Sequence, residues 1–392
     1  MINYLNKIFT KIGFKLTLTN AKSAILKDVY QSGFQKAVLV SYLKAPFLTG
    51  IDYSHSNYTE CKTAADLFHE LGYRVDVIDY TVNDYHIDYS VYEVVYGLGF
   101  PLERSFYSAD AEKLIKIFYS TGCNPFYSYQ QSALRVSEFA RQKGLIIPQS
   151  SRISDFFWTF QYLNSDLIIA LGNDFVANTY RNTNPNLKIC PINAFYFDIY
   201  DIDLNQKNFS SASKNFLWFG SSGLLHKGLD IVIDFFAERP DVTLHICGAS
   251  RNEQKFFEYY APIIENCPNI VDHGFVDIKS EKFTTIMDTC GSVVFPSASE
   301  GGAVALLNVV ANGGLIPILS NAAGLDLKPF NFPIADFATN LSVAVDHLLG
   351  LTPEEFKELA NTSKKSVREN YSYQMYKQSL KEILNQNLVK VK

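Results

Sequence analysis

The stretch FPSASEGGAVALLNVVANGGLIPILSN, residues 295–321, contains an apolar strand end, a polar turn, an apolar helix and a second apolar strand. Parallel strands joined through a helix are the unit from which open α/β folds are built. A carboxylate, Glu300, and two glycines, Gly301 and Gly302, lie in the turn that follows the first strand. Ligands of open α/β sheets bind beyond the carboxyl ends of the strands, so this turn is a candidate binding site.

The same alternation of short apolar runs and helical stretches extends along most of the 392 residues. It indicates mostly parallel sheets covered by helices. One segment interrupts it, because it is rich in Asn, Asp and Ser and shows no clear period. We therefore predict two Rossmann-like α/β domains of similar size that face a cleft. The predicted limits are 1–192 for the N-terminal domain, 193–214 for the linker, 215–370 for the C-terminal domain and 371–392 for a C-terminal helix that packs back on the N-terminal domain.

Composition and charge narrow the class of protein. Hydrophobic residues make up 47% of the chain, as in a globular protein with real cores, and the net charge of −5 lacks the basic excess of a nucleic-acid binder. The six cysteines are widely spaced and form no CxxC pair, so we expect a reducing compartment and no structural zinc. No stretch approaches the roughly 18 apolar residues of a membrane span, and we predict a cytoplasmic protein.

The N-terminal stretch MINYLNKIFTKIGFKL, residues 1–16, has apolar residues on one helical face and lysines elsewhere. Short basic amphipathic helices lie on anionic bilayers, so peripheral membrane contact through this stretch is one interpretation. The alternative is a helix that packs on the domain or frays, since short amphipathic segments are common in soluble proteins.

A second strand-end turn lies in WFGSSGLLHKGLD, residues 218–230. Its glycines allow the backbone to approach a ligand closely, and exposed amides beside Lys227 suit an anion such as a diphosphate. The spacing is neither that of a P-loop nor GxGxxG. A flexible loop with a solvated lysine is the alternative, because glycine-rich turns are frequent. The candidate ligand-binding residues of this turn are Gly220, Ser221, Ser222 and Gly223.

Two further positions, Gly248 and Glu300, each have two interpretations, and a third, Asn308, is a polar residue within an apolar helix. Gly248, in CGAS at another strand end, could admit a nucleobase or allow close helix packing. Glu300 could accept hydrogen bonds from the amides at the helix start, or point into the cleft toward sugar hydroxyls. Asn308, eight residues later, is the only polar side chain within AVALLNVVA, so it requires a hydrogen-bond partner.

Together, in order and spacing, these turns resemble the C-terminal domain of retaining glycosyltransferases of the GT-B fold, family four, over about residues 215–325. The resemblance implies transfer of a sugar from a nucleotide-sugar donor, with no cofactor and no obligatory metal. It implies that Lys227 neutralises the donor diphosphate and that Glu300 contacts the donor sugar, as the catalytic pair. It also implies that the backbone along phosphate and sugar is that of Gly301, Gly302 and Ala303.

Two positions depart from the family's pattern. Asn308 stands where the second Glu of the Glu-x7-Glu motif would meet the ribose hydroxyls, although an amide can still bind a hydroxyl. Ser222 stands where the family usually has Arg, which removes one positive charge from the diphosphate site. These departures leave open an unusual donor or a member that has lost catalysis.

The N-terminal half resembles the family in architecture only. Cys123 and Asn124 occupy the turn in which members often carry a histidine, so that histidine has no counterpart here. Asn124 remains a candidate substrate-binding residue. His55 is the substitute candidate for orienting an acceptor, and a loop or capping histidine is the alternative.

The sequence therefore predicts a glycosyltransferase that moves a sugar from a nucleotide-sugar to a glycan, polysaccharide or lipid-linked acceptor, with retention and without a metal. The N-terminal domain is expected to hold the acceptor and the C-terminal domain the donor. A nucleoside diphosphate leaves as an oxyanion, which Lys227 and helix-start amides would stabilise. The alternatives are a two-domain sugar-binding protein and a catalytically degenerate scaffold of the same fold.

Overall fold

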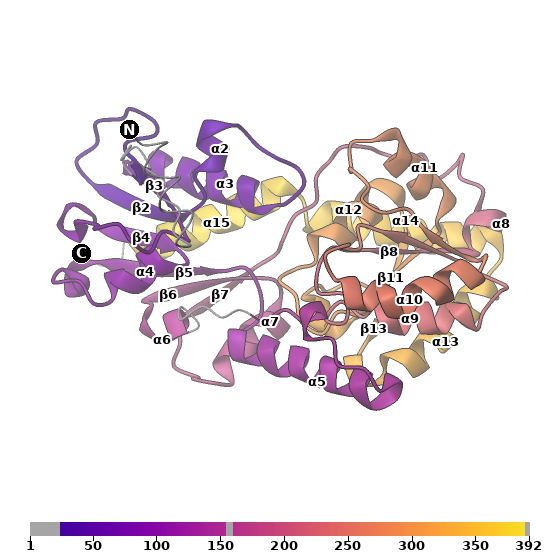
Figure 1. Cartoon of the computed structure of the whole chain (residues 1–392). Helices are drawn as coiled ribbons and strands as arrows, with labels where there is room; N and C mark the ends of the chain where they lie inside the picture. Colours follow the sequence, from indigo (N-terminus) through magenta and orange to yellow (C-terminus); the bar gives the residue numbers. More distant parts are fainter. Residues whose placement is uncertain (1–23, 154–159, 389–392) are drawn as a thin grey trace, which may run out of the picture.

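The chain folds into two α/β lobes that lie side by side, as Figure 1 shows. The computed structural model describes residues 24–153 and 160–388. The first lobe is built on a seven-stranded sheet of order β1-β3-β2-β4-β5-β6-β7, in which β1 is antiparallel to β3 and the other pairs are parallel. Its strands are β1 (Ile25–Leu26), β2 (Ala37–Tyr42), β3 (Arg74–Asp79), β4 (Val94–Gly97), β5 (Ile115–Ser120), β6 (Leu167–Leu171) and β7 (Ile189–Ile192).

The second lobe contains a six-stranded parallel sheet of order β10-β9-β8-β11-β12-β13. Its strands are β8 (Asn215–Phe219), β9 (Thr243–Cys247), β10 (Ile270–Asp272), β11 (Ser292–Phe295), β12 (Ile316–Ser320) and β13 (Phe330–Phe332). Every residue of β2 and of β11 is buried, as expected for parallel strands covered by helices on both faces. The predicted fold class, two α/β domains with parallel sheets, is confirmed.

Helices cover both sheets. The first lobe carries α2 (Ala45–Leu48), α3 (Asn57–Glu70), α4 (Phe100–Ser105), α5 (Pro125–Lys143), α6 (Gln161–Asn164) and α7 (Asp174–Arg181). The second carries α8 (Phe209–Ala212), α9 (Leu229–Ala237), α10 (Gln254–Asn266), α11 (Glu281–Thr289), α12 (Val304–Gly313), α13 (Phe337–Leu349) and α14 (Pro353–Asn370).

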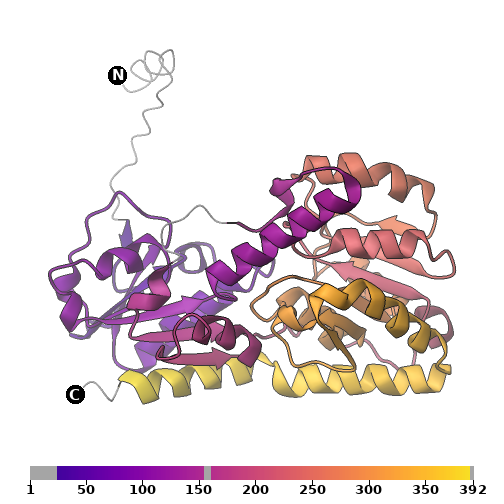
Figure 2. The same ribbon diagram turned by 90° about the horizontal axis from the view of Figure 1, so that it is seen from below.

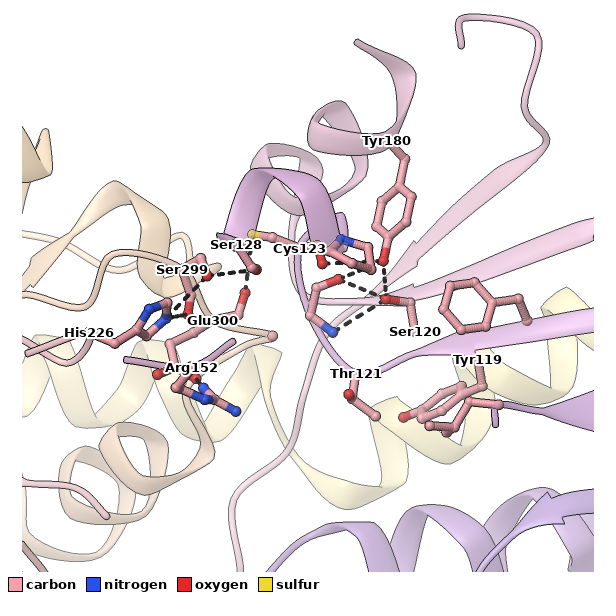
Figure 3. Close-up of a pocket in the computed structure, with 15 residues that line it drawn as sticks. Tyr119, Ser120, Thr121, Cys123, Ser128, Arg152, Tyr180, His226, Ser299 and Glu300 are labelled. Carbon is pink, nitrogen blue, oxygen red and sulfur yellow. Dashed lines mark hydrogen bonds and ion pairs between the residues drawn. The ribbon is translucent and has the colours of Figure 1, made fainter. Parts of the chain in front are cut away.

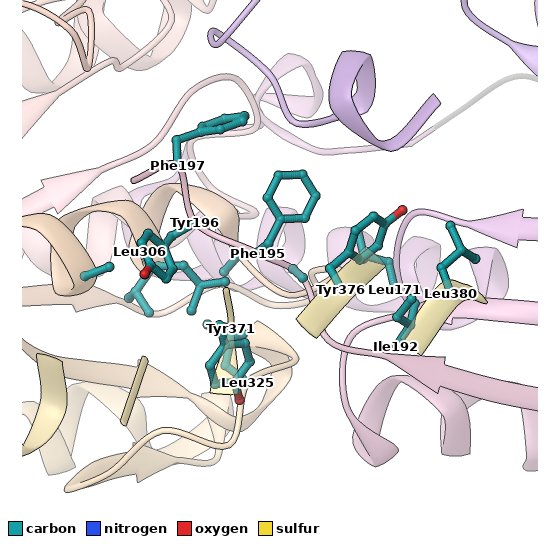
Figure 4. Packing of buried hydrophobic residues seen from close by; sticks show 14 of the residues in the cluster. Leu171, Ile192, Phe195, Tyr196, Phe197, Leu306, Leu325, Tyr371, Tyr376 and Leu380 are labelled. Carbon is teal, nitrogen blue, oxygen red and sulfur yellow. The ribbon is translucent and has the colours of Figure 1, made fainter. Parts of the chain in front are cut away.

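The last helix, α15 (Tyr373–Leu388), returns to the first lobe, and Figure 2 shows α14 and α15 running along one side of the molecule. The hydroxyl of Tyr376 lies 3.0 Å from that of Tyr119 in the first lobe. The ring of Tyr376 also packs on Phe195 of the linker, with ring centroids 4.8 Å apart (Figure 4). One apolar cluster therefore continues from the first lobe through the linker into the second.

Helix α5 extends from the first lobe onto the second (Figure 2). Phe139 on this helix, and Ile147 just after it, are buried in the apolar core of the second lobe. The carbonyl of Ser150 accepts hydrogen bonds from the N–H groups of Leu225 at 3.1 Å and His226 at 3.2 Å. The interval predicted for the N-terminal domain thus includes a segment that packs on the other lobe.

The stretch 1–16, for which membrane contact is one interpretation, lies outside the described residues. Across 24–153 and 160–388, no helix is both long and apolar enough to cross a bilayer.

Candidate functional site

A cavity of about 190 Å³ lies between the lobes, at the carboxyl ends of β5 and β11 (Figure 3). The first lobe lines it with residues around the end of β5 and the start of α5, and the second lobe with residues from two turns. The polar and ionisable side chains that line it include Ser120, Thr121, Cys123, Ser128, Arg152, Tyr180, His226, Ser299 and Glu300.

Two turns of the second lobe meet beside this cavity. Lys227 lies in the turn between β8 and α9, and Glu300 lies in the turn between β11 and α12. Since β8 and β11 are neighbouring parallel strands, their carboxyl ends lie at the same edge of the sheet. The ammonium group of Lys227 lies 3.1 Å from Oε1 of Glu300. The hydroxyl of Ser297 donates to the same oxygen at 3.0 Å.

A second cation reaches this carboxylate from the segment after α5. Nη1 of Arg152 lies 3.0 Å from Oε2 of Glu300. Burial alone would raise the pKa of Glu300, but Lys227 and then Arg152 outweigh it and hold that pKa well below its usual range. Burial lowers the pKa of Lys227, and the charge of Glu300 partly offsets this. The site thus holds an ionised carboxylate between two cations.

His226, the residue before Lys227, is buried and forms hydrogen bonds that link the second lobe to α5. Its Nε2–H donates to the carbonyl of Ser299 at 2.8 Å, and its Nδ1 accepts from the hydroxyl of Ser132 on α5 at 2.8 Å. Burial, together with nearby Arg152, lowers the pKa of His226 to about 4. The imidazole is therefore neutral near pH 7, which suits one donating and one accepting ring nitrogen. Beside it, the hydroxyls of Ser128 and Ser299 lie 2.8 Å apart.

The amides of the turn after β8 are largely occupied, contrary to the expectation that they are free for an anion. The N–H groups of Gly223 and Leu224 donate to the carboxylate of Glu253, at 2.5 and 3.0 Å. Ser221 and Ser222 are exposed at the tip of the turn. An internal carboxylate therefore fills the anion position that the sequence assigns to a ligand.

Close backbone packing explains the glycine after β9. A β-carbon on Gly248, whose φ is +81°, would lie 2.2 Å from the carbonyl oxygen of Gly220. Only a residue without a side chain permits this approach. Gly248 thus packs against the backbone that follows the neighbouring strand β8, and not against a helix as the sequence-based alternative has it.

The turn before α12 lies directly against the first lobe. A β-carbon on Gly301 would lie 2.0 Å from the carbonyl oxygen of Thr121, and one on Gly302 would lie 2.6 Å from Cβ of Ala194. Ala303, the residue before the helix, has a φ of +32°, a conformation that costs energy for a residue with a side chain. This strained turn packs tightly and leaves little room between the lobes.

Of the predicted site residues, only Glu300 and Gly301 line the cavity. Three of those that do not line it have structural partners. Oδ1 of Asn308 accepts a hydrogen bond at 2.7 Å from the N–H of Phe197 in the linker, so its carbonyl is not free for ribose. Asn124 caps α5 by accepting from the N–H of Phe126 at 2.9 Å. Nδ1 of His55 accepts from the N–H of Asn57 at the start of α3, at 3.2 Å, which favours the capping alternative over acceptor binding.

Four residues of this site are not predicted from the sequence: Arg152, His226, Ser128 and Ser299. Arg152 follows PQSS with no motif around it, and no local signal places it at Glu300. Cys123 lines the cavity, and burial raises the pKa of its thiol to about 12, so it is a neutral thiol. Within the described residues, no three His, Cys, Asp or Glu side chains are grouped to hold a metal ion.

Comparison with known proteins shows a family similarity for the part of the chain that contains Lys227 and Glu300. Residues 202–326 match the family model described as Glycosyl transferases group 1. This segment is similar to the glycosyltransferase group 1 domain. It contains both Lys227 and Glu300, and the match confirms the predicted enzyme class, a glycosyltransferase. Among curated proteins, no sequence matches the chain.

Solved structures extend the similarity from the glycosyltransferase group 1 domain to nearly the whole chain. Sucrose-phosphate synthase from Thermosynechococcus elongatus has a TM-score of 0.65 at 13% identity, covering 91% of this chain and 100% of that one. HepE of Anabaena, in complex with UDP and glucose, has a TM-score of 0.57 at 13% identity, with coverage of 91% and 100%. The lipopolysaccharide outer core galactosyltransferase WaaB, in its apo form, gives 0.53 at 12%, with coverage of 89% and 99%. The predicted GT-B fold is confirmed.

Proposed function

We propose that the chain transfers a sugar from a nucleotide-sugar donor to a glycan, polysaccharide or lipid-linked acceptor, with retention of the anomeric configuration and without a metal. One observation carries the proposal: Lys227 and Glu300 pair at 3.1 Å beside a cavity between the lobes, within a glycosyltransferase group 1 domain. Ionisable side chains with shifted pKa values beside an interdomain cavity are typical of a binding site.

In the proposed reaction, negative charge develops on the diphosphate oxygen, and Lys227 would supply the positive charge that stabilises it. The bond between the anomeric carbon and the diphosphate oxygen breaks, and the oxygen of an acceptor hydroxyl bonds to that carbon. The hydroxyl proton leaves with the diphosphate. The ammonium group of Lys227 would stabilise the departing oxyanion, as a fixed cation does strongly in a site shielded from water. Glu300 would accept a hydrogen bond from a hydroxyl of the donor sugar.

The size of the cavity adds a requirement. At about 190 Å³ it is smaller than the roughly 300 Å³ or more that ligand sites usually have. A nucleotide-sugar therefore needs the contact between Thr121 and Gly301 to separate before it can enter. Closure around the bound donor would then exclude water, which otherwise competes with the acceptor.

A catalytically degenerate scaffold of the same fold is the second candidate, and particular contacts favour it. The carboxylate of Glu253 occupies the amides of Gly223 and Leu224, and Asn308 is bonded to the linker. A chain of this kind would keep the fold and the ion pair as structural elements and would not bind a donor.

A donor screen separates the two candidates. UDP-, GDP-, ADP- and CMP-sugars are added in turn, and two quantities are measured: the melting temperature and the release of the nucleotide, which is a nucleoside diphosphate for the first three donors and CMP for the last. UDP-glucose is the first to test, because the similar HepE structure holds UDP and glucose. A stabilising donor that the protein also cleaves supports the transferase. Two results overturn the transferase. In the first, no donor binds. In the second, a donor binds but is cleaved neither in the presence of a broad set of acceptors nor by water.

A further inference from the structure

We propose that Arg152 is a diphosphate-binding residue that supplies the second cation of the donor site. The inference rests on the proposed function. It concerns a residue outside the glycosyltransferase group 1 domain, brought to the site only by the fold.

The charges of the site motivate this assignment. The turn between β8 and α9 carries one cation, Lys227, because His226 is held neutral and position 222 is a serine. A diphosphate ester presents two negative charges. A guanidinium also offers paired N–H donors that fit phosphate oxygens better than one ammonium group does. Arg152, 3.0 Å from the carboxylate that Lys227 also contacts, is the second cation at this point.

The backbone around Arg152 belongs to the second lobe by its contacts. The carbonyl of Ser150 binds the N–H groups of Leu225 and His226 in the turn that carries Lys227. The side chain of Arg152 crosses Gly223, where a β-carbon would lie 2.6 Å from its Cγ. Arg152 would therefore stay beside Lys227 when the lobes separate to admit a donor.

The ion pair between Arg152 and Glu300 is compatible with a site that binds an anionic ligand. The side chain of Arg152 is 47% exposed, whereas that of Glu300 is 10% exposed. Because the guanidinium is half-exposed, a diphosphate can reach it and replace Glu300 as its partner, while Glu300 keeps its contact with Lys227. The exchange would leave an oxygen of Glu300 free to accept a hydrogen bond from the donor sugar.

A purely structural role is the competing explanation: Arg152 would only neutralise Glu300 and hold the turn. The two roles differ in what they do to ligands of different charge. A diphosphate-binding role affects nucleoside diphosphates and leaves nucleosides alone. A structural role affects both equally, or affects only the melting temperature.

Isothermal titration tests the inference. UDP, GDP and ADP, each with its nucleoside, are titrated into the wild-type chain, Arg152→Ala, Arg152→Gln and the control Lys255→Ala, an exposed lysine on α10. We expect Arg152→Ala and Arg152→Gln to raise the Kd of the bound diphosphate about 10- to 100-fold, with nucleoside affinity unchanged. In the Arg152→Ala background, Ser222→Arg adds a cation on the residue before Gly223, which the side chain of Arg152 crosses. This second substitution should restore part of the affinity for the diphosphate.

The outcomes are distinguishable. If the wild-type chain binds a diphosphate and both Arg152 variants bind it equally well, this inference falls and the proposed function stands. Equal weakening of nucleoside and diphosphate also overturns it, in favour of a structural role. If the wild-type chain binds none of the three diphosphates, this inference falls, and the donor screen decides the proposed function separately.

Discussion

Arg135 on α5 donates from Nη2 to both carboxylate oxygens of Asp230 on α9, at 2.7 and 2.5 Å, and both side chains are buried. Nε of the same guanidinium donates to the carbonyl of Leu225 at 3.2 Å. This contact fixes the crossing helix against the turn that carries Lys227. The geometry of the candidate site thus depends on a residue that does not itself line the cavity.

Removing one partner of this pair should be costly. Asp230→Ala leaves the Arg135 guanidinium buried without a counter-charge, and we expect the free energy of unfolding to fall by about 3–5 kcal/mol. Urea denaturation measures it. The double variant Arg135→Met/Asp230→Leu removes both charges and should recover much of the loss. A single variant as stable as the wild type would show that the pair is not buried in solution.

Lys227 should matter for turnover. Replacing it with Ala removes the cation beside the leaving group, and we expect the rate of donor cleavage to fall roughly 10- to 1,000-fold. Initial rates at saturating donor measure the effect, and Lys255→Ala, an exposed lysine of the same lobe, is the matched control. Unchanged turnover in Lys227→Ala would remove this residue from the mechanism.

Glu300→Gln should have opposite effects on diphosphate binding and on catalysis. The carboxylate now occupies both cations, so an uncharged amide of the same shape leaves them free for a diphosphate. We expect tighter binding of free nucleoside diphosphate and about 10-fold or greater loss of turnover. Titration and initial rates provide the two measurements. A lower melting temperature with full activity would instead favour the structural interpretation of Glu300.

A reversible link between the lobes tests whether they must separate. The hydroxyls of Ser128 and Ser299 lie 2.8 Å apart, so cysteines at both positions should form a disulfide. Ser128 follows the capped start of α5, which is bonded to the first lobe through Thr179. We expect the oxidised double variant to lose donor binding and to regain it with reductant. Each single cysteine variant under the same oxidant is the control, and full binding in the linked form would contradict the requirement for opening.

The buried histidine predicts a pH dependence of stability. The pKa of His226 is lowered to about 4, against about 6.5 in an unfolded chain. Between these values the unfolded state binds the additional proton, so this contribution is complete above about pH 6.5 and is lost as the pH falls to 4. The full loss is about 3 kcal/mol for this residue. Urea unfolding at pH 7 and pH 5 should show a shallower dependence of stability on pH for His226→Gln than for the wild type.

The sequence predicts the strands that build the site because parallel strands buried on both faces are continuous apolar runs. The runs at 215–221 and 292–297 contain β8 and β11, and the turns after them bring Lys227 and Glu300 together. By contrast, β13 is the three-residue segment FNF, too short to give a periodic signal.

The contacts that complete the site come from sequence-distant segments, which no local pattern specifies. Asn308 has the partner that a polar residue on a buried helix requires, but helical periodicity does not say that the partner is the N–H of Phe197. Glu253 precedes α10 and gives no sign that its carboxylate binds the turn after β8. Arg152 reaches Glu300 only because α5 crosses between the lobes.

The two crossings of the chain limit how the protein can be divided. A fragment that starts in the linker would lack the partners of Leu225 and Asp230, and it would expose the apolar surface that Phe139 and Ile147 cover. A fragment that ends in the linker would lose α15, whose Tyr376 is buried against the first sheet. Chimeras that exchange donor specificity with a related enzyme therefore need to transplant the second half of α5 and the ten residues or so after it together with the donor lobe, and to keep the terminal helix with its recipient.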